Sequence, residues 1–418
     1  MGMNDEFDVI VVGGGLAGLC AAAHARHDGA RVVVLEAHGL GGRARCVTRD
    51  DFVLNMGAHA LYRGGPGAAA LAGLGIVPDG APPPLATYRA LVGGHLERLP
   101  TGPVSLLRSG TLSPRSKVQA ARFLATLPRL EPARYQQVTV ADWLEGLRLR
   151  PDVGALVRAL LRLGTYTSDL DAMSADAAIG QMQLAAKGGV HYLHGGWDQL
   201  TGALAAGLDV RTSTGATAVV PTASGFRVGT PAGTLSAAAV VLAPGGPDAV
   251  RSLLPDDPGW PDPGPPVTAA CLDLGVARVP SPGYVLSLDD PLYVNVQSPP
   301  ARQAPTGGAV VCALRYGSRS AAEDRPELES LVARAGVRRE DVVVERFLAS
   351  MTVAATTPRA DLGGLAGRPA TDSTRVPGLF VAGDWVGPRG LLADAALASG
   401  ADAGRRATRA AFSAGSRR

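Results

Sequence analysis

The chain has 418 residues, of which 46% are hydrophobic and 18% are charged. Its 54 glycines and 32 prolines make up about a fifth of the sequence, below the roughly 25–30% typical of disordered chains. This composition excludes a disordered or collagen-like protein and predicts two or three folded domains. The net charge is only +3, and because arginines are interleaved with acidic residues, no nucleic-acid partner is expected. Only Lys117 and Lys187 among the 40 basic residues are lysines.

The four cysteines, Cys20, Cys46, Cys271 and Cys312, lie far apart in the sequence and have no spacing that suits zinc. No metal site is therefore expected, and reduced thiols of this kind are typical of a cytoplasmic protein. Residues 1–7 lack the basic start of a signal peptide. No apolar run reaches the roughly 18 residues of a membrane span. We therefore expect a cytoplasmic protein.

The first 36 residues predict a βαβ unit. The apolar, β-branched run Phe7–Val12 is typical of a buried parallel strand, and a helix is expected from the glycines that follow to about residue 28. A second buried strand at Arg31–Leu35 ends in Glu36. This arrangement indicates a dinucleotide-binding fingerprint.

Each glycine of the fingerprint has a physical reason. Gly13 permits the tight turn, Gly15 lets the backbone approach a pyrophosphate, and Gly18 lets helix and strand pack closely. The free N–H groups at the helix start favour the phosphates. Glu36 is placed to accept hydrogen bonds from an adenosine ribose.

The C-terminal region predicts a second anchor for an extended dinucleotide. A short strand at Leu379–Ala382 ends in Gly383-Asp384, and a helix is expected from Leu391 to Arg406. FAD requires an acid near its ribitol and a helix N-terminus near its pyrimidine ring, whereas an NAD site needs neither. The cofactor expected is therefore FAD.

These motifs resemble the flavin amine oxidase superfamily, which includes monoamine and polyamine oxidases, protoporphyrinogen oxidases and phytoene-type desaturases. The resemblance implies non-covalently bound FAD, with Asp384 at the ribitol, Leu392 N–H facing the flavin O2, and the segment "NMGAHALY" over the isoalloxazine. It also implies that Ala216 stands where a valine usually pairs with adenine through its backbone. The implied cofactor-binding residues are Gly13, Gly15, Leu16, Ala17, Gly18, Glu36, Ala37, Gly42, Arg43, Gly57, Ala58, His59, Ala216, Gly383, Asp384, Gly390, Leu391, Leu392 and Ala395.

The expected fold is α/β: a discontinuous, Rossmann-like FAD-binding domain and an α+β substrate domain with a mixed sheet covered by helices. The FAD-binding domain is predicted from residues 1–80, 190–266 and 371–418, with a Pro-rich crossing before residue 267. The substrate domain is predicted from residues 81–189, mainly helical, and 267–370, mainly strands. Within it a helix should begin at Ser113-Pro114 and run through about Leu127.

Two departures from the amine oxidases bear on the reaction. Those enzymes commonly carry a lysine near flavin N5 and an aromatic side chain directly before the residue that faces flavin O2. This chain has no lysine after Lys187, and Leu391 occupies the aromatic position. An arginine does not easily replace lysine as a neutral base. The departures favour the desaturase-like branch, in which a hydride equivalent passes from a substrate C–H bond to flavin N5. A C–C or C–N bond of a small apolar or natural-product substrate is thereby desaturated or oxidised.

Several alternatives stay open. The chain could be a redox-neutral isomerase or cyclase, an amine oxidase without the usual lysine, or a prenyl-lipid escort protein of the same fold. The sequence does not identify the electron acceptor, for which O2 is one candidate, or the oligomeric state.

Three features have two interpretations each. His59 either moves a proton over the flavin or shapes its loop. His191 and His194 either contribute to a metal site or have a structural role. The basic segment Arg115–Arg134 either contacts a membrane surface or is a solvated helix over the substrate pocket.

Overall fold

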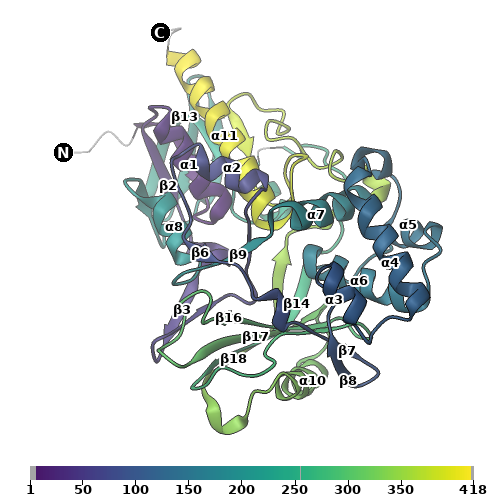
Figure 1. Ribbon diagram of the computed structural model, residues 1–418. Coiled ribbons are helices and arrows are strands. Elements are labelled where there is room, and N and C mark those ends of the chain that lie inside the picture. The colour runs from purple at the N-terminus through teal and green to yellow at the C-terminus, as the bar shows by residue number, and fades with distance from the viewer. Residues whose placement is uncertain (1–5, 255, 416–418) are drawn as a thin grey trace.

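The computed structural model describes residues 6–254 and 256–415. Residues 1–5, on which the signal-peptide interpretation partly depends, lie outside this range. Two large sheets organise the chain (Figure 1), one near the termini and one at the opposite end of the molecule. The prediction of a mixed α/β fold is confirmed, whereas the domain boundaries stay a prediction.

The first sheet has the strand order β10-β2-β1-β13-β12-β11, with β19 paired to β13. Strands β1, β2, β10, β13 and β19 run parallel where they pair, and β11 and β12 extend the sheet as antiparallel strands. Valine and isoleucine side chains bury both faces, as the apolar run of β1 predicts. The strands are β1 (Glu6–Val12), β2 (Val32–Leu35), β10 (Asp209–Arg211), β11 (Ala218–Thr222), β12 (Gly225–Thr230), β13 (Gly233–Leu242) and β19 (Leu379–Val381).

Helices α1 (Leu16–His27) and α11 (Leu392–Gly415) cross one face of this sheet in close contact. A Cβ at Gly400 would lie 2.4 Å from Ala17 O, and one at Gly404 would lie 2.2 Å from Ala21 O. Glycine at both positions therefore lets the two backbones touch. The remaining helices of this half are α2 (Pro66–Ala72), α8 (Asp198–Ala205) and α9 (Pro247–Arg251).

The second sheet has the order β18-β14-β17-β16-β15-β7-β8 and is antiparallel except between β15 and β7. Helices α3 to α7 form a layer at one side (Figure 1). The strands of the second sheet are β7 (Arg89–Val92), β8 (His95–Arg98), β14 (Val267–Val276), β15 (Val285–Ser287), β16 (Leu292–Ser298), β17 (Ala309–Tyr316) and β18 (Val342–Ala354). The helices are α3 (Pro103–Arg108), α4 (Pro114–Thr126), α5 (Val140–Gly146), α6 (Pro151–Thr165), α7 (Ala175–Gly188) and α10 (Ala321–Arg334).

The second sheet has two chemically different faces. Arg315 of β17 pairs with Asp324 and Glu327 of α10, so its face is the one that α10 covers. Side chains alternate along a strand, so Cys312, Leu314 and Tyr316 point the other way. The register places Asp273 opposite Cys312 and Tyr293 opposite Leu314 on this inner face. A buried face that carries an acid, thiols and phenols is unusual for a core and indicates a site.

Most expected elements are present. Strand β14 has the predicted bounds, and α4 begins at Pro114 with Ser113 Oγ accepting from Ser116 N. The expectation that residues 81–189 are mainly helical misses the hairpin β7–β8, which joins the second sheet. Its strands have four residues each around Gly93-Gly94, too short for a periodic signal.

The other strands form two small sheets: β3 (Cys46–Arg49) with β4 (Phe52–Asn55), and β5 (Leu61–Tyr62) and β6 (Gly80–Ala81) on either side of β9 (Val190–Leu193). Among the described residues, no helix is both long and apolar enough to cross a bilayer.

Candidate functional site

The glycines after β1 form the turn that the fingerprint predicts. Gly13 has φ +107°, and a Cβ there would lie 2.2 Å from Ala243 O. A Cβ on Gly18 would lie 1.9 Å from Gly13 O, so only glycine fits. Gly15 is different, because a Cβ there would meet no atom within 4 Å. The open space at Gly15, beside the free N–H groups where α1 begins at Leu16, suits the pyrophosphate of a dinucleotide.

A second glycine segment lies against this turn. Gly41 N donates to Gly14 O at 2.8 Å, and a Cβ on Gly42 would lie 3.4 Å from Gly15 Cα. The structure thereby places Gly42 and Arg43 beside Gly15, although Gly15 and Gly41 are 26 positions apart in the chain. The resemblance implies both segments for the same pyrophosphate.

The acid at the end of β2 is held by the main chain. Glu36 Oε2 accepts from Gly14 N at 2.6 Å, and Oε1 accepts from His38 N at 2.7 Å. Thr214 N donates to Glu36 O, and a Cβ on Gly215 would lie 3.0 Å from Ala37 Cβ. Glu36, Ala37 and the segment that contains Ala216 therefore lie together at the expected adenosine end.

The two ends of the chain meet at Asp384. Arg43 donates to both carboxylate oxygens of Asp384, at 2.7 and 2.8 Å, and Ala355 N donates at 2.9 Å. Burial alone would raise the pKa of Asp384, but Arg43 and these hydrogen bonds outweigh it and hold the pKa below the usual value. Asp384 therefore stays ionised next to Gly383, where the resemblance places the ribitol.

Arg368 braces the segment between Asp384 and α11. Its Nη1 donates to Asp384 O and its Nη2 to Gly390 O, both at 2.9 Å. Burial lowers the pKa of Arg368 to about 10, with Asp384 opposing the shift. No acid within ion-pair distance neutralises it in the described part of the chain. This guanidinium fixes both ends of the segment that precedes the expected pyrimidine site.

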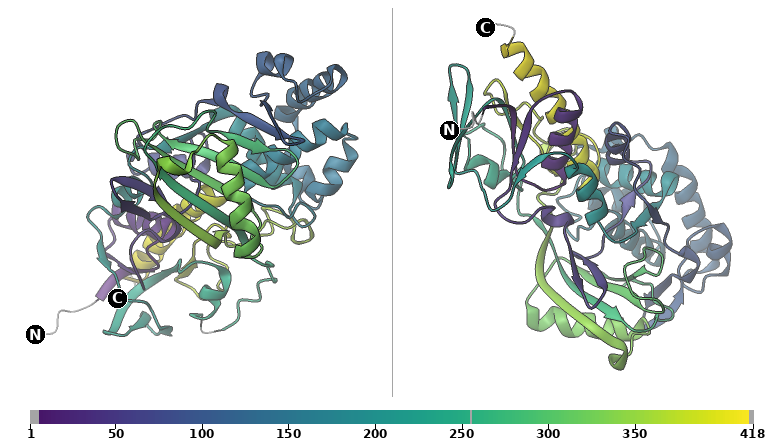
Figure 2. Two further views of the ribbon diagram at one scale, coloured as in Figure 1. Left: turned by 90° about the horizontal axis from the view of Figure 1, so that it is seen from below. Right: turned by 90° about the vertical axis from the view of Figure 1, so that its left-hand side faces the viewer.

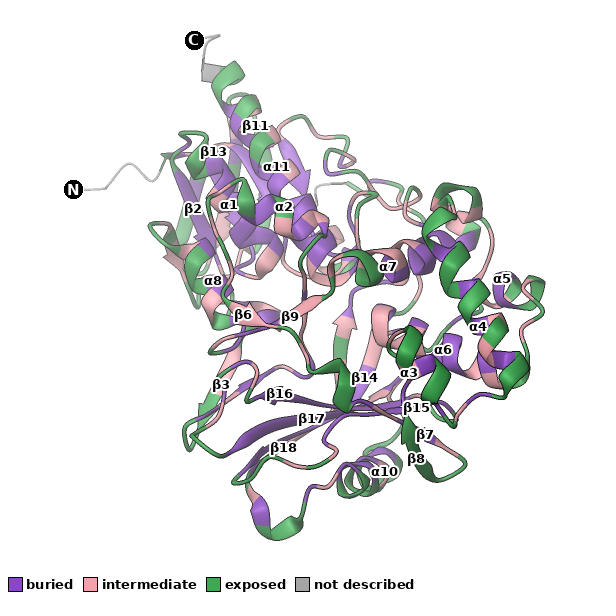
Figure 3. Ribbon diagram, viewed as in Figure 1, coloured by how far each residue is buried: buried purple, intermediate pink, exposed green. Residues whose placement is uncertain are grey.

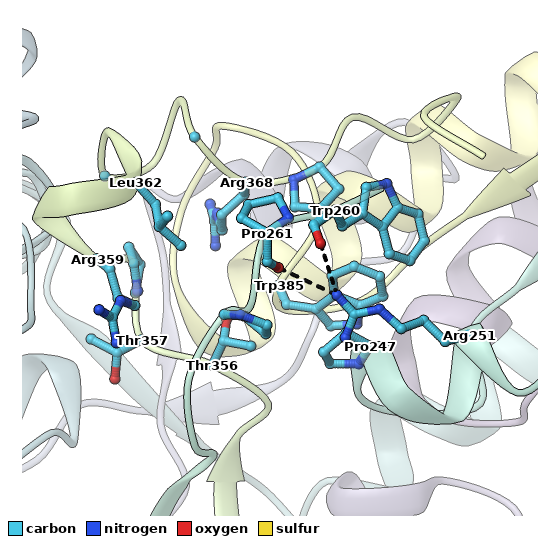
Figure 4. Close-up of a pocket in the computed structure, with 15 residues that line it drawn as sticks. Pro247, Arg251, Trp260, Pro261, Thr356, Thr357, Arg359, Leu362, Arg368 and Trp385 are labelled. Atoms are coloured by element: carbon cyan, nitrogen blue, oxygen red, sulfur yellow. Dashed lines mark hydrogen bonds between the residues drawn. The ribbon is translucent and has the colours of Figure 1, made fainter. Parts of the chain in front are cut away.

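A narrow cavity of about 30 Å³ borders Arg368 (Figure 4). Its walls come from residues 247–263 and 356–369 together with Trp385, and Arg251 closes one side by donating to Trp260 O and Pro261 O. The buried Nε of Arg368 has no hydrogen-bond partner in the described part of the chain. A cavity of this size has room for one or two waters but not for a cofactor.

The start of α11 carries unusual backbone geometry. Gly390 has φ +74° and Leu392 has φ +53°, a left-handed conformation that a leucine rarely adopts. Ala395 N donates to Leu391 O, and Leu391 is buried against the core of the second sheet. Strain of this kind is common at ligand sites. It lies where the resemblance places the flavin O2.

Side chains from the second sheet and from the helices beside it bind the loop Asn55–His59. Arg346 donates to Asn55 O, Tyr166 Oη to Ala58 O, and Gln297 Nε2 to His59 O. Gly57 has φ +83°, and a Cβ there would lie 2.5 Å from Met351 Cε. The expected isoalloxazine loop thus rests on the inner face of the second sheet.

Both ring nitrogens of His59 face main-chain carbonyls. Nδ1 lies 3.1 Å from Gly57 O and Nε2 lies 3.2 Å from Arg43 O. Burial lowers the pKa of His59, so the ring is neutral and carries one proton for two acceptors. Because neither nitrogen points away from the backbone, these contacts favour a loop-shaping role. The catalytic role stays a prediction.

Tyrosines dominate the interior next to this loop. Tyr88 Oη lies 3.2 Å from both Tyr192 Oη and Tyr293 Oη. Tyr166 and Tyr316 pack edge to face at 5.8 Å. Burial raises the pKa of each of these phenols, so all are neutral.

The inner face also brings Cys271 and Cys312 together, with their sulfurs 3.3 Å apart and Asp273 beside them. The Cys312 contact lowers the pKa of Cys271, but burial and the neighbouring Asp273 together outweigh it and raise the pKa to about 11. Asp273 is engaged by Arg346 at 2.6 Å. These are neutral thiols next to a compensated carboxylate, which is a poor donor set for a cation.

The two histidines of the other candidate pair do not converge on further ligands in the described residues. His194 Nε2 lies 3.8 Å from Asp79 Oδ1, and burial lowers the pKa of His191. These contacts support the structural role.

Several residues around the site were not found from the sequence: Asp273, Gln297, Arg346, Arg368 and the tyrosines. One weak signal was present. Polar residues at every second position interrupt otherwise apolar strands, as in "NVQ" at residues 295–297. On a strand this spacing gives one polar face.

Comparison with known proteins identifies the family. The family model for flavin containing amine oxidoreductase matches residues 16–271, more than half of the chain. A search of curated proteins finds no match.

Solved structures share the fold. Wild-type putrescine oxidase bound to putrescine is 19% identical with a TM-score of 0.72, covering 96% of this chain and 98% of that one. Cyclohexylamine oxidase from Brevibacterium oxydans IH-35A is 17% identical with a TM-score of 0.70, covering 96% and 99%. An oxidoreductase from Methanosarcina mazei is 17% identical with a TM-score of 0.67, covering 94% and 99%. The chain belongs to the flavin containing amine oxidoreductase family and is an FAD-dependent oxidoreductase.

Proposed function

We propose that this oxidoreductase removes a hydride equivalent from a C–H bond of a small, uncharged and largely apolar substrate, as in desaturation, rather than oxidising a cationic amine. FAD, when bound, supplies the hydride acceptor. The protein's residues bind and orient the substrate and exclude water.

One observation carries the proposal: the inner face of the second sheet offers no free carboxylate to an ammonium group among the described residues. Asp273 is the acid on this face, and Arg346 neutralises it at 2.6 Å. The neighbouring side chains are neutral phenols and thiols. A cation placed there would lose its hydration without gaining a counter-charge, which is costly.

Asp394, at the start of α11, is a further acid near the site, and its buried Oδ2 has no hydrogen-bond partner among the described residues. Its Oδ1 accepts from Gly67 N at 2.8 Å, and a Cβ on Gly65 would lie 2.3 Å from its Oδ2. Leu391, where amine oxidases carry an aromatic side chain, is buried and apolar. The apolar side chain of Leu391 supports an apolar substrate.

Anaerobic mixing tests the proposal. The purified protein should be yellow, and an acyclic terpenoid hydrocarbon in detergent should bleach its flavin, whereas putrescine and cyclohexylamine should not. Rapid bleaching by either amine would overturn the proposal. Admitting air afterwards tests O2 as the acceptor, since reoxidation by O2 yields hydrogen peroxide.

A further inference from the structure

Helices α3 and α4 present a surface that is both basic and apolar. Apolar side chains are exposed on both helices, for example Leu107 at 73% and Val118 at 52%. We define the α3–α4 surface as Val104, Leu107, Arg108, Arg115, Lys117, Val118, Arg122, Leu124 and Arg129. Figure 3 shows the exposed outer faces of both helices.

The surface is continuous. Lys117 Nζ donates to Leu107 O at 2.8 Å, which joins α4 to the end of α3. Along α4, Arg115, Val118 and Arg122 follow one another at helical spacing and are all exposed. Residues at this spacing share one face.

The charge of the surface has one sign. Between Glu97 and Glu131 the sequence contains no acid, while six cations fall in that interval. Arg108, Arg115 and Arg122 have no acid within ion-pair distance in the described ranges, and Arg129 donates only to Ala125 O. A whole-chain charge of +3 is thus unevenly distributed.

We propose that the α3–α4 surface docks on an anionic lipid bilayer. Aliphatic side chains interleaved with unpaired cations match a bilayer interface, where the aliphatic groups enter the acyl boundary and the cations meet the headgroup phosphates. A second copy of the same chain would meet like charge and is repelled.

The position of the surface suits this role. In the left view of Figure 2 the dark blue helices of this region lie at the end of the molecule opposite the two termini. The buried sides of the same helices, through Leu106 and Phe123, belong to the core that the inner face of the second sheet also lines. Lipid binding is independent of the chemistry at the flavin and would hold with another substrate.

Co-sedimentation of the flavin-loaded enzyme with vesicles tests the proposal. Binding is expected to vesicles of about 30% phosphatidylglycerol in phosphatidylcholine, to be weak for phosphatidylcholine alone, and to be reversed by high salt because the exposed charges are screened. Removing two cations in R115Q/R122Q should weaken binding roughly 25-fold.

A matched pair of variants distinguishes binding through the α3–α4 surface from nonspecific adsorption to vesicles. L107S/R122Q removes one exposed aliphatic side chain and one cation from the surface and should weaken binding at least about tenfold. V77S/R409Q also removes one exposed aliphatic side chain and one exposed cation, but away from the α3–α4 surface, and should bind as the wild type does. Failure to bind phosphatidylglycerol vesicles at low salt, equal losses in both variants, or capture only by an acidic protein would overturn the proposal. The flavin spectrum and Tm of each variant show whether it is folded.

Discussion

The contacts around the two large sheets are of different chemical kinds. Around the first sheet the contacts that shape the cofactor site are between main-chain atoms, and they require glycine at Gly13 and Gly18. On the inner face of the second sheet they are between side chains, as in the pair Arg346–Asp273 and the tyrosine hydroxyls. The structure around the first sheet therefore depends on positions without a side chain, and that on the inner face of the second sheet depends on paired side chains.

The largest expected effect comes from the glycines of the first half. Gly18→Ala forces a Cβ to 1.9 Å from Gly13 O, so the variant should be destabilised by about 3 kcal/mol or more and yield little folded protein. Gly15→Ala meets no protein atom and should fold with a wild-type Tm.

The same Gly15→Ala variant should lose FAD affinity by about 100-fold, which corresponds to about 2.7 kcal/mol. The added Cβ occupies the space expected for the pyrophosphate. Calorimetry of FAD binding to the apoprotein measures this. If Gly15→Ala binds FAD normally, the pyrophosphate lies elsewhere.

The next prediction concerns the ion pair on the inner face of the second sheet. Arg346→Met leaves Asp273 buried without a counter-charge and frees Asn55 O, so it should reduce the free energy of unfolding by about 3–5 kcal/mol. The double variant D273N/R346M removes the uncompensated charge and should recover part of the loss. Urea denaturation of all three proteins checks this, and a loss below about 1 kcal/mol in R346M would contradict a buried ion pair.

The strands and turns of the first sheet could be predicted from the sequence because the constraints on them are local. The turn Gly13–Gly18 requires glycine for its own geometry, and the strand before it is recognisable from its composition. The contacts of the second sheet join residues that are far apart in the sequence: Arg346 and Asp273 are 73 positions apart, and Gln297 and His59 are 238 positions apart. Which strands are neighbours decides these pairs, and no local pattern encodes that choice.

A third prediction concerns Asp394 of α11, which lies against the start of α2. Burial raises its pKa to about 6 from 3.8, so the folded state holds the proton more tightly than the unfolded state. The stability this gives is fully present below about pH 3.8 and is lost as the pH rises through 6.

Asp394→Asn mimics the neutral acid and can still accept from Gly67 N. At pH 8 it should be more stable than the wild type by up to about 3 kcal/mol, and the difference should shrink as the pH falls to 5. Thermal or urea unfolding at each pH measures it. A variant that is less stable at pH 8 would show that the ionised carboxylate is needed there.

A smaller effect is expected at Arg368, on the cofactor side. Arg368→Met removes the hydrogen bonds to Asp384 O and Gly390 O and an uncompensated positive charge. Because reduction adds negative charge at the flavin, its midpoint potential should fall by about 30 mV, equivalent to about 1.4 kcal/mol for two electrons. Arg359→Gln is the control, since Arg359 lines the same cavity but pairs with Asp361. Equal potentials in both variants would assign Arg368 no electrostatic role.

The smallest effect is expected at His59, whose ring nitrogens lie against Gly57 O and Arg43 O and whose own carbonyl accepts from Gln297 of the second sheet. His59→Gln can keep one of these hydrogen bonds, so the protein should retain FAD, and flavin reduction by a substrate identified in the anaerobic test should slow less than about tenfold. A group that moves a proton in the transition state contributes roughly 10²–10⁴-fold. A loss in that range, together with the disappearance of a limb from the pH profile of kcat/KM, would instead make His59 catalytic. A modest loss with an unchanged pH profile means that the histidine shapes the loop that rests on the inner face of the second sheet, and that the proton leaves by another route.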